Sequence, residues 1–383
     1  ENPATWLKCE NPAASIWQPT NYPSISLSKT ALSVHQTARL ITKASNYLQK
    51  PNLPSRTPKT LRIITPEHGL FAVSNIIFGC GAVGGLLING KDEEKQDTFE
   101  LAIRSGVNWF DTAPSYGAGV SESALGCLLT TADAAIQVST KVSIDSRDSD
   151  YYGQVERSLS DSLRRLNKSR VTLIQLHNPI ANDTNGRVIG INEIMKPHGV
   201  LDALDNIKMQ GMASEIGITG LGETAALLKV IKSNRLASMQ LVYNLLNASA
   251  AISMPPSWPH YNFTGLVDTC FEHGVAVFGI RAFAAGILAT TQRHGKEQPL
   301  TPSDTIASEQ FKQQHLSQVL FGHKKPDARL ALRFALSQPR IHAVIIGLAQ
   351  TKHLEMALRA TEEGPLDEQS LAQIQTGWRS FKG

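Results

Sequence analysis

The sequence alternates between short apolar runs and helical patterns from Ile76 almost to its C-terminus. Eight runs are typical of buried strands: 76–79, 107–110, 136–141, 171–177, 213–218, 239–242, 275–278 and 342–346. Helices are predicted between them at 94–104, 121–129, 151–166, 200–209, 223–231, 265–272 and 327–336. Strands that alternate with helices form parallel sheets with right-handed crossovers. Eight such units predict an α/β fold, the closed (β/α)8 TIM barrel.

Three consecutive strand candidates deliver ionisable residues to the same edge. Asp111 follows the second run and Tyr116 lies on the loop after it, while Lys141 and His177 close the third and fourth runs. One such residue alone is most often a solvated strand end. In a barrel the carboxyl ends of all strands face one mouth, so the four side chains are expected to converge. An open doubly wound sheet is the alternative, but it gives no reason for this convergence.

The stretches around these residues resemble the aldo-keto reductase superfamily. G-V-N-W-F-D-T-A-P-S-Y-G at 106–117 is followed by S-E-S-A-L-G, S-T-K and L-H-N-P, in that family's order. The resemblance runs from about Leu61 to the C-terminus. It implies a catalytic tetrad of Asp111, Tyr116, Lys141 and His177. The first stretch and Y-N-L-L-N are nearest to the branch of aldose and galactose dehydrogenases.

The tetrad suits hydride transfer to a carbonyl. The carbonyl oxygen becomes negative and needs a proton donor in a positive field. A free phenol has a pKa of about 10, and the Lys141 ammonium is expected to lower the pKa of Tyr116 while Asp111 anchors that ammonium. His177 is expected to orient the oxygen or share the proton. No side chain supplies a hydride, so the resemblance implies a nicotinamide cofactor, NADP(H) or alternatively NAD(H).

The resemblance also implies cofactor-binding residues. They are Gly79 at the first strand end, Thr219 and Gln240 for the carboxamide, and Gly347 and Thr351 in the adenosine segment. Where the family usually has an aromatic residue that stacks on the nicotinamide, this sequence has Ile280 or Arg281, and Arg281 is expected to reach the pyrophosphate instead. Many relatives carry an Arg and an Asn in that last segment, where this sequence has Ala349 and Ala357. Lys352 or Arg359 is therefore expected to contact the cofactor's phosphate.

Gly79, Gly81 and Gly84 match G-x-G-x-x-G after a strand. A Rossmann turn opens directly into a helix, yet L-L-I-N-G follows here and the next helical pattern begins near Asp92. We therefore interpret the glycines as room for a flat ring against the backbone.

The aromatic residues Trp109, Trp258 and Phe283 are the first candidates to line a substrate pocket, with Trp109 more typical of a core position. The loops at 178–196 and 247–262 are expected to set substrate specificity.

Residues 1–60 differ in composition from the rest and are predicted to be an N-terminal extension of unknown function, with one helix at 33–48. Residues 61–383 are predicted to form the barrel domain. L-R-I-I-T at 61–65 and H-G-L-F-A-V-S at 68–74 resemble the hairpin that closes the barrel bottom in the family.

The composition limits the classes of partner. A net charge of +4 and the lack of a basic run argue against nucleic acid. No apolar run is long enough to span a membrane. The cysteines Cys9, Cys80, Cys127 and Cys270 form no C-x-x-C pair, so no metal site is predicted and reduced thiols in the cytoplasm are expected. A small carbonyl or sugar substrate is the expected partner.

The leading hypothesis is an NAD(P)(H)-dependent oxidoreductase that uses Tyr116 as proton donor. An aldose 1-dehydrogenase working in the oxidative direction is one alternative. A cofactor-binding regulatory subunit, like the potassium channel β-subunits of the superfamily, is another. A barrel without cofactor that acts as a scaffold is a third, disfavoured by the complete tetrad.

Overall fold

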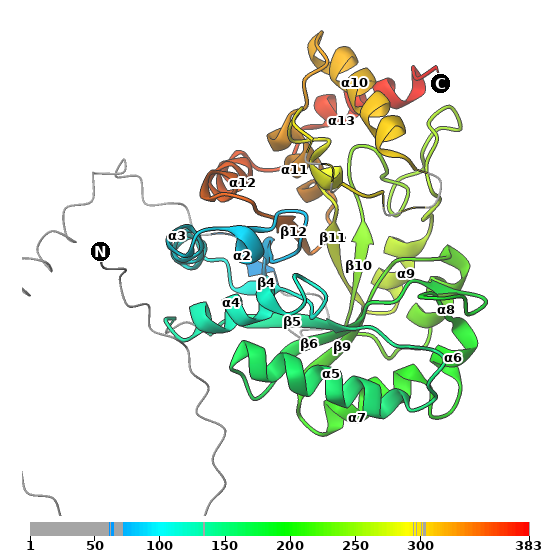
Figure 1. Ribbon diagram of the computed structural model, residues 1–383. Coiled ribbons are helices and arrows are strands. Elements are labelled where there is room, and N and C mark those ends of the chain that lie inside the picture. The colour runs from blue at the N-terminus through cyan, green and yellow to red at the C-terminus, as the bar shows by residue number, and fades with distance from the viewer. Residues whose placement is uncertain are drawn as a thin grey trace, which may run out of the picture. The chain divides into compact units, whose positions relative to one another are not determined.

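The computed structural model describes residues 61–382 except 62, 65–71, 133–134, 294, 296, 300 and 302–303. Eight parallel strands close into a barrel in the order β3-β4-β5-β6-β9-β10-β11-β12 (Figure 1). They span Ile76–Gly79, Trp109–Asp111, Gln137–Val142, Val171–Leu176, Ala213–Thr219, Ser238–Val242, Ala276–Ile280 and Ala343–Gly347. The predicted TIM barrel is confirmed. The predicted extension at 1–60, with its helix at 33–48, lies outside the described residues.

Helices surround the strands of the barrel (Figure 1). They are α2 Leu86–Asn89, α3 Asp92–Arg104, α4 Val120–Leu129, α5 Tyr151–Leu166, α6 Ile191–Met195, α7 Val200–Met209, α8 Thr224–Ile231, α9 Leu266–Glu272, α10 Ile306–Phe321, α11 Ala328–Leu336, α12 Thr351–Glu363 and α13 Glu368–Arg379. The seven predicted helices are all present, with ends that differ by at most two residues. Helices α10 and α13 lie side by side near the C-terminus (Figure 1).

The glycine-rich stretch after β3 differs from the prediction in one detail. A single helical turn, α2, begins at Leu86, directly after Gly85. Gly85 has φ 73°, a left-handed conformation that glycine adopts without strain. The short turn does not make a Rossmann unit, because the strands close into a barrel.

The barrel encloses a small apolar cluster beneath a polar layer. Trp109, Leu173 and Phe278 project inward from three strands and are fully or almost fully buried, and Val73 joins them from below. Val73 belongs to β2, Val73–Ser74, which pairs antiparallel with β1, Ile63–Ile64. The predicted hairpin is therefore present, and its second strand covers the barrel bottom.

Side chains on the outer faces of the strands join the helices in a larger core. Within the described residues, no helix combines the length and the apolar composition needed to cross a bilayer. The same part of the chain holds no group of His, Cys, Asp and Glu side chains that could bind a metal ion.

Candidate active site

A buried ion pair occupies the centre of the barrel mouth. Lys141 Nζ lies 2.6 Å from Asp111 Oδ2 and donates a second bond of 2.8 Å to the carbonyl oxygen of Thr112. The Asp111 and Lys141 side chains are 4% and 1% exposed. The nearby carboxylate holds the pKa of Lys141 above its usual value despite the opposing effect of burial. Lys141 is therefore a fixed positive charge at neutral pH.

The other oxygen of Asp111 accepts three neutral donors. Ser139 Oγ lies 2.7 Å from Oδ1, Gln240 Nε2 lies 2.8 Å away and Gln175 Nε2 lies 3.2 Å away. The three donors lie on β5, β6 and β10 of the barrel, and all of them are buried. Asp111 is thereby fully hydrogen-bonded, which allows an ionised carboxylate to stay in a dry interior.

Tyr116 lies beside the ion pair. Lys141 Nζ is 4.8 Å from the centroid of its ring. Burial raises the pKa of Tyr116 above its usual value, and the lowering by Lys141 is the smaller effect. Lys141 thus lowers the pKa of Tyr116 as expected, but desolvation of the phenolate outweighs this effect, so that the net shift is upward. Tyr116 is a protonated phenol at neutral pH.

His177 completes the group. Its ring meets the Tyr116 ring edge-on, with the centroids 6.1 Å apart. Burial, with a smaller contribution from Lys141, lowers the pKa of His177 to about 4. The imidazole is therefore neutral at physiological pH and can donate or accept a hydrogen bond. The structure brings all four predicted tetrad residues together.

A cavity of about 460 Å³ lies beside the ends of β11 and β12. Of the predicted cofactor residues, Arg281, Gly347 and Lys352 line it. Phe283 also lines this cavity. Arg281 adopts a left-handed φ of 62°, a strained conformation of the kind that collects at ligand sites. Its guanidinium donates to the carbonyl oxygen of Gln298 at 2.7 Å.

The remaining predicted cofactor residues lie outside that lining. Thr219 Oγ1 donates to the carbonyl oxygen of Leu176 at 3.1 Å. Gln240 donates to Asp111, as described above. The amide of Thr351 donates to Glu94 Oε1 at 3.3 Å, and Arg359 is exposed on α12.

Gly79 allows a close approach of two strands. A Cβ on Gly79 would lie 2.7 Å from the carbonyl oxygen of Ile346 on β12. Gly81 does face a ring, because its Cβ would lie 3.5 Å from the side chain of Tyr116. Gly79 therefore serves strand packing, and Gly81 lies beside the Tyr116 ring, while room for a cofactor ring at these glycines stays a prediction.

Arg293 is a basic residue that no sequence motif marks, and it lies next to Gly286 of the cavity lining. Its Nε and Nη1 are buried and have no hydrogen-bond partner among the described residues. Nη1 lies 3.9 Å from the position of a Cβ on Gly286, which lines the cavity. Unsatisfied guanidinium donors suit an anionic group. In the sequence, only its position as a basic residue on the loop after the seventh barrel strand could have indicated Arg293 as a candidate.

The suspected pocket aromatics separate into core and cavity residues. Trp109 and Trp258 are fully buried, and the indole of Trp258 donates to the carbonyl oxygen of Leu246 at 2.8 Å. Trp258 therefore packs inside the 247–262 loop. The 178–196 loop contains two short strands, β7 Ile180–Ala181 and β8 Ile189–Gly190, and α6.

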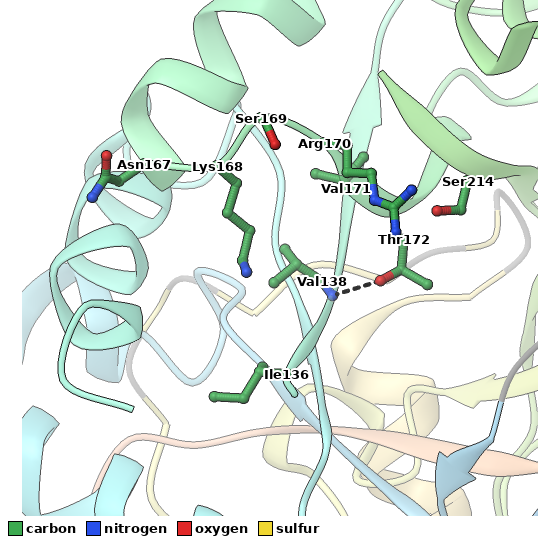
Figure 2. Close-up of a pocket in the computed structure, with 9 residues that line it drawn as sticks. All are labelled: Ile136, Val138, Asn167, Lys168, Ser169, Arg170, Val171, Thr172 and Ser214. Carbon is green, nitrogen blue, oxygen red and sulfur yellow. Dashed lines mark hydrogen bonds between the residues drawn. The ribbon is translucent and has the colours of Figure 1, made fainter. Parts of the chain in front are cut away.

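A second cavity, of about 430 Å³, lies at the opposite end of the barrel (Figure 2). It is lined by residues at the start of β5, β6 and β9, among them Val138 and Thr172, whose backbone amide and hydroxyl are joined at 3.2 Å. Lys168 and Arg170 give it a polar rim. Because the tetrad lies at the carboxyl ends of the strands, this cavity is separate from the candidate active site.

Comparisons with known proteins agree with this geometry. The sequence model of the Aldo/keto reductase family matches residues 75–379. A D-threo-aldose 1-dehydrogenase of a Pseudomonas species is 24% identical over 306 residues, covering 72% of this chain and 85% of the relative. The L-galactose dehydrogenase of Arabidopsis thaliana is 24% identical over 317 residues, covering 79% and 90%.

Solved structures show the same fold. The holo form of an aldo-keto reductase from Bacillus halodurans has a TM-score of 0.62 at 20% identity, covering 83% of this chain and 96% of that one. A glycerol dehydrogenase from Gluconobacter oxydans has a TM-score of 0.60 at 20% identity, covering 85% and 97%.

Proposed function

This chain belongs to the aldo/keto reductase family and is an oxidoreductase, and we propose that it transfers hydride between NADP(H) or NAD(H) and a small carbonyl or alcohol. The observation that carries the proposal is the buried group of Asp111, Tyr116, Lys141 and His177 at the barrel mouth. Tyr116 is the proton donor in reduction. The cofactor is NADP(H), with NAD(H) as the alternative.

The proton step rests on the protonation states of the side chains. With its pKa raised, Tyr116 is a protonated phenol at neutral pH, and with its pKa lowered His177 is a neutral imidazole with one N–H. Tyr116 can therefore give its proton to a carbonyl oxygen that becomes negative, and neutral His177 can direct an N–H to the same oxygen. Lys141, held by Asp111, then stabilises the phenolate left on Tyr116.

The cavity beside β11 and β12 fits a phosphate-bearing cofactor. Arg281 and Lys352 supply positive charge along its wall, and Arg293, next to Gly286 of that wall, has two buried nitrogens without a hydrogen-bond partner among the described residues. These residues would hold the anionic part of the cofactor. A nicotinamide cofactor, when bound, supplies or accepts the hydride that no side chain can carry.

Oxidation of a sugar is the second candidate function. Two relatives bear the names D-threo-aldose 1-dehydrogenase and L-galactose dehydrogenase. In that direction Tyr116 accepts the proton of the sugar hydroxyl, with Lys141 and His177 in the same positions. An aldose is therefore the first alcohol substrate to test.

The experiment compares the full-length protein with Tyr116→Phe, which removes one hydroxyl and keeps the ring. Each protein is titrated with NADPH and with NADH by fluorescence. Turnover is then measured with a simple aldehyde in reduction and with L-galactose in oxidation. We expect both proteins to bind nucleotide and turnover to fall at least about 100-fold in the variant, the scale of general acid catalysis.

Two outcomes contradict the proposal, each in a different part. Unchanged turnover in Tyr116→Phe would exclude Tyr116 as the donor. Failure of the wild-type protein to bind either nucleotide would exclude the cofactor.

A further inference from the structure

We propose that Ser139 is a positioning residue that aims the Asp111 carboxylate at Lys141, and that the Trp109 indole fixes the direction of the Ser139 hydroxyl. Ser139 is the second residue before Lys141, and Trp109 belongs to the apolar cluster inside the barrel. The role of Ser139 rests on the proposed role of Tyr116 as proton donor and acceptor.

The geometry is a directed chain of hydrogen bonds. Trp109 Nε1 lies 3.0 Å from Ser139 Oγ, and Ser139 Oγ lies 2.7 Å from Asp111 Oδ1. The indole N–H can only donate, and a serine hydroxyl has one hydrogen. With the indole occupying an acceptor site of Ser139, the single hydroxyl hydrogen points at Asp111. Trp109 and Ser139 are 0% and 1% exposed, so water does not compete for these bonds.

The chain fixes which carboxylate oxygen faces Lys141. Oδ1 accepts from Ser139, Gln175 and Gln240, and the ammonium of Lys141 bonds Oδ2 at 2.6 Å. Ser139 makes the shortest of the three bonds to Oδ1. Its loss would let the carboxylate turn and would leave more uncompensated negative charge beside Tyr116.

Both effects act on Tyr116 in the same direction. The charge of Asp111 raises the pKa of Tyr116, and Lys141 lowers it. If the charge of Asp111 is less neutralised, or if the ammonium of Lys141 is displaced, the pKa of Tyr116 therefore rises further. At a fixed pH the fraction of phenolate falls, and oxidation, which needs Tyr116 to accept a proton, slows.

The test compares Ser139→Ala with Thr140→Val, a control on the same strand. Thr140 Oγ1 also donates to a buried carboxylate, Glu122 Oε1 at 2.6 Å, but Glu122 lies on α4, away from Asp111. Each variant thus loses one buried hydroxyl-to-carboxylate bond. The logarithm of the oxidative rate is measured against pH, together with the thermal midpoint of unfolding.

We expect both variants to lose thermal stability and only Ser139→Ala to lose activity. Its oxidative rate should fall about 10-fold at each pH, the scale of one hydrogen bond to a charged group. The slope of the plot should stay the same. Trp109→Phe should give a smaller fall, and adding it to Ser139→Ala should change the rate no further, because its effect passes through the hydroxyl.

Equal pH plots for Ser139→Ala and the wild type would overturn the proposal and leave Ser139 with a packing role. A Trp109→Phe effect that persists undiminished in Ser139→Ala would overturn the part assigned to the indole. A wild-type protein without turnover would contradict the proposed function instead. In that case the free energy of unfolding is measured for Ser139→Ala, Lys141→Met and the double variant. Additive losses of this free energy would show that Ser139 does not act on the ion pair and would overturn the proposal.

Discussion

Lys141 Nζ and Asp111 Oδ2 are 2.6 Å apart in a site that excludes water from both side chains. Asp111 is the last residue of β4 and Lys141 the last but one of the neighbouring β5. The register pairs Asp111 with Ser139, two residues before Lys141 on the same face of β5. The pair is therefore built by the barrel itself and does not depend on a loop.

Removing both partners of this pair should cost less free energy of unfolding than the two single removals added together. Asp111→Asn leaves the ammonium with only the Thr112 carbonyl oxygen, and we expect it to lower the free energy of unfolding by about 3 kcal/mol. Lys141→Met should cost less, because Asp111 keeps three neutral donors. The double variant should be more stable than the sum of the single losses predicts. Urea unfolding of the four proteins measures this, and additive losses would contradict it.

The two directions of the reaction should differ in their pH dependence. Burial raises the pKa of Tyr116, so the phenol stays protonated and reduction should be nearly independent of pH between about 6 and 9. Oxidation needs the phenolate, and its rate should rise about 10-fold per pH unit over the same range. Initial rates at saturating cofactor provide the measurement. A fall in reduction centred near neutral pH would show that another group supplies the proton.

Protonation of His177 should weaken the fold in acid. Its pKa is about 4 when folded, and about 6.5 in an unfolded chain. Between these values the unfolded state binds more protons, so stability is lost as the pH falls from 6.5 to 4, by about 3 kcal/mol in total. His177→Asn should lose this part of the acid sensitivity. The urea midpoints of the two proteins, measured at about pH 7.5, 5.5 and 4.5, should converge in acid.

The barrel could be predicted because its elements are short, regular and separated by clear breaks. The predicted helix at 151–166 coincides with α5, Tyr151–Leu166. Helix α10 could not be predicted from an apolar stripe, because its buried face includes Glu309 and Lys312. Lys312 is satisfied there by the Pro259 carbonyl oxygen and Asp304, both at 3.0 Å. Buried polar contacts of this kind leave no periodic signal in a sequence.

The tetrad could be predicted because each member ends a strand or follows one. The donors to Asp111 could not, because Ser139 and Gln175 lie inside apolar runs, where a polar residue indicates neither its face nor its partner. The cofactor residues stay predictions, because Ala349 and Ala357 stand where many relatives carry an Arg and an Asn. The amide of Thr351 donates to Glu94, and Lys352 and Arg359 are both exposed on α12.

Lys352 and Arg359 should differ in their effect on cofactor binding. Both lie on α12, but Lys352 lines the 460 Å³ cavity and Arg359 lies two turns further along the helix. Lys352→Met should weaken NADPH binding about 10-fold or more, as expected for the loss of one charged contact to a phosphate. Arg359→Met, the matched control, should leave the Kd unchanged. The reverse result would place the phosphate at Arg359.

Gly84 should not tolerate a larger residue, because its Cα lies close to the backbone of Leu348. A Cβ on Gly84 would lie 2.3 Å from the Leu348 amide nitrogen and 2.5 Å from its carbonyl oxygen, which is backbone that cannot move aside alone. That carbonyl also accepts from the Leu86 amide at 3.0 Å. Gly84→Ala must therefore separate the loops after β3 and β12, at a cost of about 1–3 kcal/mol.

Gly81→Ala is the matched control for this change. Its Cβ would meet the Tyr116 ring at 3.5 Å, an ordinary contact. We expect Gly81→Ala to keep the urea midpoint of the wild type and Gly84→Ala to lower it. Because Gly84 also lines the cavity, Gly84→Ala should weaken NADPH binding as well. Equal midpoints for the two variants would mean that the loops separate without cost and that their contact does not hold the cavity in shape.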